Sequence, residues 1–196
     1  GLYTKQYFGD ERYQMLVNGS QGHSVPIVDG IFQKEGRQSC AEKVDAAIGE
    51  DAVIFSADIA KAYPGSGLES LQRNLTFAKK GNPSLLIQDT AVFADAVRPF
   101  TERLITKFPV TAEKNQAVIH GKKGELILTG SKGIFSVSKT SYKRKVDEPD
   151  EEVYLLDLVL NPIEPGRETM GGDITGSRAL DVSICAVYRE QTTISK

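Results

Sequence analysis

The chain has 196 residues, of which 40% are hydrophobic and 26% charged, and its formal net charge is −2. This length and composition are typical of one globular domain with a substantial core, so we expect a single domain over residues 1–196. A net charge near zero creates no overall field that would attract nucleic acid. No apolar run approaches the roughly 18 residues needed to span a bilayer. We therefore expect neither nucleic acid nor a membrane among the partners of this protein.

The N-terminus begins Gly1-Leu2-Tyr3, without an initiating Met and without the apolar core of a signal peptide. We interpret the chain as a piece cut from a longer protein. Targeting signals would precede Gly1, so the compartment stays open between periplasmic, secreted and cytoplasmic. Cys40 and Cys185 are too few to build a disulfide framework, and we expect two free or buried thiols.

Short runs with alternating or β-rich composition recur along the chain and are separated by turn residues. In chain order the predicted strands are Met15–Val17, Ser24–Val28, Val53–Ala57, Leu71–Ala78, Leu85–Phe93, Thr101–Phe108, Ala117–His120, Glu125–Thr129, Ile134–Lys139, Val153–Leu160 and Leu180–Tyr188. One short helix is predicted over Asp58–Tyr63, begun by Asp58 and ended before Pro64. About eleven strands with so little helix indicate an all-β, antiparallel β-sandwich of two sheets rather than a closed barrel.

The segments between the strands contain clear turn signals. Glycines in His120–Glu125 and in Thr129–Gly133 predict two hairpin connections, and Lys80–Pro83 separates two further strands. The charged stretch Lys139–Glu152 is expected to be a solvated loop. Glycines and prolines in Asn161–Ser177 predict a long surface loop before the last strand, of the kind that often carries function.

The segment from Gly22 to Gln33 carries the most informative polar residues. His23 precedes a short apolar strand, where its side chain can stay accessible, and a neutral imidazole can act as base, hydrogen-bond donor or metal ligand. A purely structural histidine beside an apolar strand is the alternative. Gln33 closes the segment and adds a second polar group. Asp29-Gly30 is a standard tight-turn pair, which is the favoured explanation of Asp29.

Other polar residues give weaker signals. No Ser-His-Asp arrangement, zinc-protease motif, Walker motif or dinucleotide fingerprint is present, so nucleotide binding is set aside. His120 has no companions in the sequence, which favours an exposed or packing role. A zinc site needs at least three ligands, and the two histidines and two scattered cysteines do not show such a spacing. Arg98, Arg103 and Lys107 could pair with sulfates or uronates, although ordinary solvation is favoured.

Four segments in the first half of the chain are distinctive: Ser20–Gln33, Ala57–Tyr63, Gln72–Phe77 and Leu86–Asp89. Shorter matching pairs precede them at Tyr3-Thr4, Tyr7-Phe8 and Arg12-Tyr13. In sequence and in order, these segments resemble the start of the C-terminal β-sandwich module of heparinase II/III-type polysaccharide lyases. The remainder of the chain resembles that module only as further strands.

The resemblance implies the C-terminal domain of a bacterial lyase whose upstream α/α toroid is absent from this chain. In such enzymes an acidic polysaccharide or oligosaccharide lies between toroid and sandwich, and glycans containing uronic acid are cleaved by β-elimination. His23 matches the histidine with which the sandwich borders this cleft. The match implies that His23 assists the chemistry or holds a metal ion, with zinc as the candidate cofactor of the parent enzyme. Many members have Asn after this histidine, where this chain has Ser24. We expect Gln33 to bind the substrate.

Two alternatives come from other classes of protein. A stand-alone carbohydrate-binding sandwich would bind glycan without a partner domain, but the absence of Trp and an aromatic content of 8% argue against it. A purely structural domain would only support the fold of the toroid. Because the groups for proton abstraction and leaving-group protonation are not all encoded here, we expect the isolated chain to be inactive.

Overall fold

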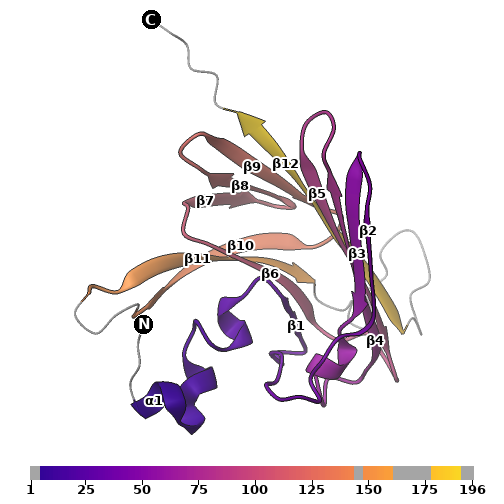
Figure 1. Cartoon of the computed structure of the whole chain (residues 1–196), viewed down its shortest axis with the longest axis vertical. Helices are drawn as coiled ribbons and strands as arrows, with labels where there is room; N and C mark the ends of the chain where they lie inside the picture. Colours follow the sequence, from indigo (N-terminus) through magenta and orange to yellow (C-terminus); the bar gives the residue numbers. More distant parts are fainter. Residues whose placement is uncertain (1–4, 144–147, 161–177, 191–196) are drawn as a thin grey trace, which may run out of the picture.

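The structure is a computed structural model that describes residues 5–143, 148–160 and 178–190. Its strands form one four-stranded and one eight-stranded antiparallel sheet, which confirms the expected all-β sandwich (Figure 1). The number of strands among the described residues is thus twelve, close to the number predicted.

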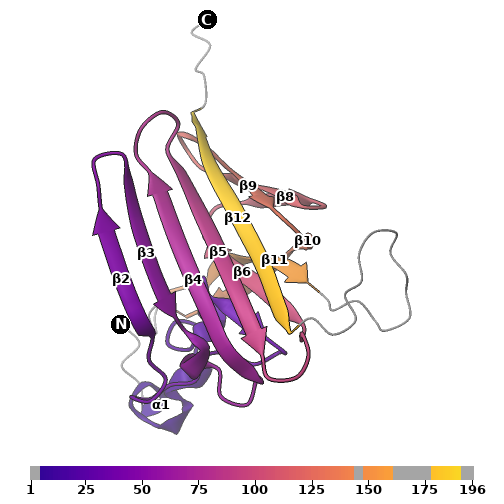
Figure 2. The ribbon, with the colours of Figure 1, turned by 90° about the vertical axis from the view of Figure 1, so that its right-hand side faces the viewer.

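The small sheet has the order β1 (Pro26–Val28), β6 (Phe100–Thr106), β11 (Glu151–Leu160) and β10 (Ile134–Tyr142). The large sheet has the order β2 (Glu42–Ile48), β3 (Ala52–Asp58), β4 (Leu68–Ala78), β5 (Ser84–Phe93), β12 (Ala179–Glu190), β9 (Gly124–Gly130), β8 (Gln116–His120) and β7 (Val110–Glu113). Figure 2 shows β2, β3, β4, β5 and β12 of the large sheet side by side.

Four short helical segments are present among the described residues. The α-helix α1 (Lys5–Phe8) and the 3₁₀ turns η1 (Asp10–Gln14) and η2 (Ser20–Gly22) precede β1, and η3 (Ala60–Ala62) follows β3. The N-terminal turns lie on the side of the small sheet away from β7, β8 and β9 (Figure 1). The sequence predicted only the last of these segments.

The helix predicted around Asp58 is only the 3₁₀ turn η3, because Asp58 itself ends β3. The Asp58 carboxylate accepts hydrogen bonds from the amide of Ala60 at 3.2 Å and from the amide of Leu71 at 3.1 Å. It therefore begins the turn, as expected, but it also fixes the turn to β4.

The hydrophobic core lies between the two sheets, where alternate residues of each strand point inward. Leu71 of β4, Ile184 of β12, and Leu156 and Leu158 of β11 are fully buried. On β12 the buried Val182, Ile184 and Ala186 alternate with the half-buried Ser183 and the exposed Cys185. Both cysteines are free and exposed.

A buried cluster of charges joins the two sheets. Arg73 on β4 donates from Nε to Asp89 Oδ1 on β5 at 2.9 Å and from Nη2 to Glu102 Oε2 on β6 at 2.7 Å. Asp89 and Glu102 are each 2% exposed, and Glu102 Oε1 has no hydrogen-bond partner among the described residues. Burial, reinforced by the Asp89 carboxylate, raises the pKa of Glu102 well above its usual range, whereas Arg73 acts in the opposite direction.

The edge strand β2 was not predicted from the sequence. All seven of its residues are exposed, and the apolar Val44, Ala46 and Ile48 occupy alternate positions, so the sequence carries a short alternating signal here that the prediction missed. Its pairing with β3 shifts between Glu42 and Asp45, which is a β-bulge, and Lys43 at the bulge has a φ of 48°.

Three other expectations differ from the structure. Met15–Val17 is not a strand, because the amides of Asn18 and Gly19 both bond back to the Met15 carbonyl and close a turn. The short strand β7 was missed. Thr129–Gly133 does not close a hairpin: it carries the chain from β9 in the large sheet to β10 in the small sheet.

The remaining connections agree with the sequence in part. His120–Glu125 and Lys80–Pro83 do join neighbouring antiparallel strands. The stretch Lys139–Glu152 is less of a loop than expected, since β10 continues to Tyr142 and β11 begins at Glu151. The predicted loop Asn161–Ser177 lies outside the described residues.

Candidate functional site

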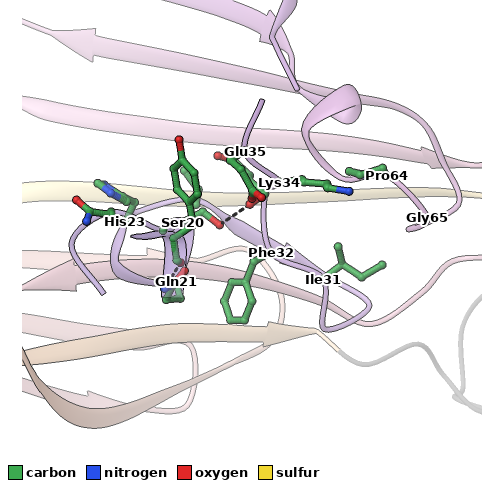
Figure 3. Close-up of a pocket in the computed structure, with 14 residues that line it drawn as sticks. Ser20, Gln21, His23, Ile31, Phe32, Lys34, Glu35, Pro64 and Gly65 are labelled. Carbon is green, nitrogen blue, oxygen red and sulfur yellow. Dashed lines mark hydrogen bonds between the residues drawn. The ribbon is translucent and has the colours of Figure 1, made fainter. Parts of the chain in front are cut away.

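An open hollow of about 920 Å³ lies beside β1 and contains both predicted site residues, His23 and Gln33, in its wall (Figure 3). It is lined by Tyr13, Asn18, Gly19, Ser20, Gln21, His23, Val25, Ile31, Phe32, Gln33, Lys34, Glu35, Pro64 and Gly65. The lining thus joins the N-terminal turns, the two ends of the β1 segment and the turn after β3. A volume of this size can accommodate several sugar-sized groups.

His23 follows the 3₁₀ turn η2 and has extended backbone. Its amide donates to the Ser20 carbonyl at 3.1 Å, and its carbonyl accepts from the amide of Val25 at 3.0 Å. The side chain is exposed, and its ring makes no hydrogen bond to any other described residue. An imidazole in this position is free to exchange a hydrogen bond or a proton with a bound ligand.

The loop that carries His23 is tied to its surroundings by side chains of η2. Ser20 Oγ donates to the Gln33 carbonyl at 3.2 Å, and Gln21 Nε2 donates to the Tyr13 carbonyl at 2.9 Å (Figure 3). A side chain at Gly22 would place its Cβ 1.9 Å from the Leu16 carbonyl oxygen. Glycine is therefore required immediately before His23, because the backbone of residue 16 passes so close.

Gln33 is half-buried, and its side chain lies near the hydroxyl of Tyr63, whose pKa it lowers against the larger effect of burial. That hydroxyl donates to the Pro26 carbonyl at 2.7 Å. Tyr63 is 2% exposed, and burial is the main cause that raises its pKa above the usual value. Tyr63 therefore remains a neutral donor that ties the turn after β3 to the start of β1. This link was not predicted, although Tyr63 closes the Ala57–Tyr63 segment.

Two aromatic side chains also line the hollow. Tyr13 is 43% exposed and Phe32 is 39% exposed. The guanidinium of Arg12 lies 5.6 Å from the centre of the Tyr13 ring, and that of Arg103 lies 5.9 Å from the centre of the Phe32 ring. Neither residue was predicted as a site candidate. Tyr13 and Phe32 belong to no recognisable sequence motif, and they come together at the hollow only when the chain folds.

Other candidate residues lie elsewhere. Asp29 has a φ of 53° and belongs to the tight turn between Val28 and Ile31, as predicted, with its carboxylate accepting from Arg98 at 3.1 Å. His120 on the large sheet contacts Glu125 at 3.1 Å and Thr111 at 2.9 Å, and its side chain is 38% exposed, which agrees with the exposed alternative expected for it. Arg103 is not merely solvated, because it pairs with Asp157 and its side chain is only 13% exposed.

A metal at His23 finds little support in this part of the protein. Zinc needs at least three protein ligands, usually Cys, His or carboxylates. Within residues 5–143, 148–160 and 178–190, no three such side chains gather into a group that could hold a metal. His23 alone therefore supplies one ligand, and the described residues do not fit a zinc site. None of the helices described here is long and apolar enough to cross a membrane.

The arrangement defines an all-β sandwich with an open, polar and partly aromatic hollow against its small sheet. No protein-family model matches the sequence, and no curated protein matches it. Solved structures match over almost the whole chain. Heparan sulfate lyase HepC from Pedobacter heparinus superimposes with a TM-score of 0.65 and 13% identity, over 100% of this chain and 28% of that chain.

Two heparinase III structures match as well. The BT4657 gene product gives a TM-score of 0.68 and 8% identity over 98% of this chain, and a second heparinase III gives 0.63 and 13% over 97%. At such identities the likeness shows the fold, and at that level it confirms the predicted resemblance to a domain of heparinase II/III-type lyases. The chain spans 28% of the length of HepC and of the BT4657 product.

Proposed function

We propose that the chain is the C-terminal β-sandwich domain of a polysaccharide lyase that cleaves uronic-acid-containing acidic glycans by β-elimination. Its hollow would form one wall of the substrate cleft, and an upstream α/α toroid would form the other. One observation carries this proposal: the histidine singled out by the sequence is exposed at the 920 Å³ hollow of a domain that has the fold found in a heparan sulfate lyase.

The chemistry assigns distinct tasks to the two site residues. In β-elimination a base removes the proton at C5 of the uronate, the uronate carboxylate is neutralised, and an acid protonates the leaving glycosidic oxygen. His23 can accept the proton or donate a hydrogen bond to the uronate, because its ring has no hydrogen-bond partner among the residues that the structure describes. Gln33 contributes an amide to the hollow and binds the sugar. A metal is not required for either task.

Replacement of His23 tests this proposal. In the enzyme that contains this domain, His23→Ala should lower kcat at least about tenfold, because one general acid–base group contributes about 10²–10⁴-fold. The rate of formation of unsaturated uronate, followed by its ultraviolet absorbance, is the measurement. His120→Ala is the matched control, since His120 contacts Glu125 away from the hollow. Turnover that stays near wild type in His23→Ala would favour the purely structural alternative.

The carbohydrate-binding alternative is favoured by one observation, the exposure of Tyr13 and Phe32 at the hollow. Aromatic rings at such a position can stack on the apolar face of a sugar. This alternative differs from the lyase proposal in a measurable way: the chain alone would bind an oligosaccharide, and Phe32→Ala would abolish binding while His23→Ala would not.

A further inference from the structure

We propose that Arg103 and Ser24 are positioning residues that hold the His23 loop, residues 20–24, against β6. Arg103 Nη1 donates to the Gln21 carbonyl at 3.4 Å, and the amide of Ile105 donates to Ser24 Oγ at 3.1 Å. The two bonds bracket His23 on either side, and both come from one strand. The expected effect on turnover rests on the proposed function of His23. The placement of the loop against β6 is independent of that function.

Arg103 is itself fixed before it reaches the loop. Its Nε and Nη2 donate to the two oxygens of Asp157 on β11 at 2.8 and 2.7 Å, and both side chains are largely buried. Two parallel bonds to one carboxylate hold the plane of a guanidinium, which a lysine ammonium could not reproduce. The third nitrogen is thereby directed at Gln21. The same guanidinium lies over Phe32, so one group supports both sides of the hollow.

The Ser24 side chain bonds to β6 just beyond the point where the main-chain pairing of β1 with β6 ends. β1 pairs with β6 only over Pro26–Val28, and the next amide that could bond across to β6, that of Val25, bonds back to the His23 carbonyl instead. The amide of Ile105 lies beyond that pairing and is satisfied by the Ser24 hydroxyl instead. Ser24 therefore extends the attachment of β1 to β6 up to the residue next to His23.

Hydrogen exchange in this chain tests the placement directly. The amides of His23 and Val25 are bonded within the loop, so loosening the loop should expose them. In Arg103→Gln and in Ser24→Ala, their exchange should become about fivefold faster, as expected for the loss of one hydrogen bond. The NMR signal of the His23 ring should shift or broaden in both variants.

Arg189→Gln is the matched control, because Arg189 also pairs with a carboxylate, that of Glu125, across antiparallel strands but away from the hollow. It should leave the exchange and the ring signal unchanged. Unchanged exchange and an unchanged His23 signal in Ser24→Ala and Arg103→Gln would overturn the proposal. If Arg103→Gln does not fold, Ser24→Ala decides alone.

Turnover separates this proposal from the one on which it rests. In the enzyme that contains this domain, Arg103→Gln and Ser24→Ala should each lower kcat about fivefold and leave KM within about twofold, because a misplaced group loses orientation rather than binding. Faster exchange with unchanged turnover, in an enzyme that His23→Ala inactivates, would contradict the positioning role. If His23→Ala leaves turnover intact, the proposed function fails, and hydrogen exchange still decides how the loop is held.

Discussion

Asp89 and Glu102 lie between the sheets with one guanidinium, that of Arg73, to serve both carboxyl groups. Two ionised carboxylates with a single buried cation would leave a negative charge that burial makes costly. A proton on Glu102 removes this charge, which explains the direction of its pKa shift. The folded protein therefore retains a proton at pH values where an unfolded glutamate has lost it.

Glu102→Gln should make stability less dependent on pH. Because the folded pKa of Glu102 lies above its ordinary value of 4.5, the stability that its proton contributes is complete below that value and is lost as the pH rises through the folded pKa. Glutamine keeps the neutral shape and has no proton to lose, so the variant should gain stability relative to wild type as the pH rises.

Urea unfolding from about pH 5 to about pH 9 measures this difference, with the exposed Glu113→Gln as the control. A difference between Glu102→Gln and wild type that stays constant over this range would contradict the explanation.

Arg73→Met should lower the free energy of unfolding by about 3–5 kcal/mol at neutral pH, because it leaves buried carboxyl groups without their cation.

At the scale of elements, a strand could be predicted where one of its faces is buried. Val182 and Ile184 of β12 alternate with exposed neighbours, and that alternation is visible in the sequence. In β2 both faces meet solvent, so the short alternation of Val44, Ala46 and Ile48 does not reflect burial. The turn at Met15 is closed by main-chain hydrogen bonds, which the side chains do not reveal. The short β-rich run Met15–Val17 was therefore wrongly predicted as a strand.

The same reasoning explains what could be predicted of the site. His23 and Gln33 stand in one continuous segment of the sequence, and the resemblance pointed to His23 alone. Tyr63 contacts Pro26 and Arg103 contacts Gln21 only because η3 and β6 pack beside that segment, and nothing local in the sequence records this packing. Contacts between distant segments follow from the register of the sheets, which was not available from the chain.

Gly22→Ala should disturb the His23 loop more than the rest of the fold. A Cβ at residue 22 would meet backbone atoms of Leu16, so the loop or the preceding turn must move. We expect a loss of about 1–3 kcal/mol in unfolding free energy and a changed NMR signal of the His23 ring. Gly49→Ala is the control, because its Cβ would meet only an ordinary contact at 3.4 Å and should change stability by less than about 0.5 kcal/mol. Equal effects of the two substitutions would contradict the close packing at residue 22.

At the scale of the whole molecule, the hollow lies against one layer of the sandwich and stays open on the other side. Arg103 contacts Gln21 and Phe32 in the wall of this hollow, while Glu102, the preceding residue of β6, faces the core, so one strand serves both. The sandwich thus offers a rigid wall, with His23 exposed on it. Elimination needs a base, an acid and a group that neutralises the uronate carboxylate, which is more than this wall presents.

The isolated chain should therefore show no lyase activity. Incubation with heparan sulfate, alginate or hyaluronan should give no rise in the absorbance of unsaturated uronate, because one imidazole cannot perform all three tasks. The enzyme that contains this domain serves as the positive control. A steady rise with the isolated chain, abolished by His23→Ala, would show that the domain carries a complete site and would refute the two-walled cleft.

The irregular edge of the large sheet has a consequence for the behaviour of the protein in solution. Val44 and Ile48 leave apolar side chains open to water on β2, where a regular strand would be a template for edge-to-edge addition. The bulge at Lys43 and the charges of Glu42 and Asp45 interrupt that template. The bulge and the charges thus disfavour edge-to-edge association through β2, although the whole strand is exposed.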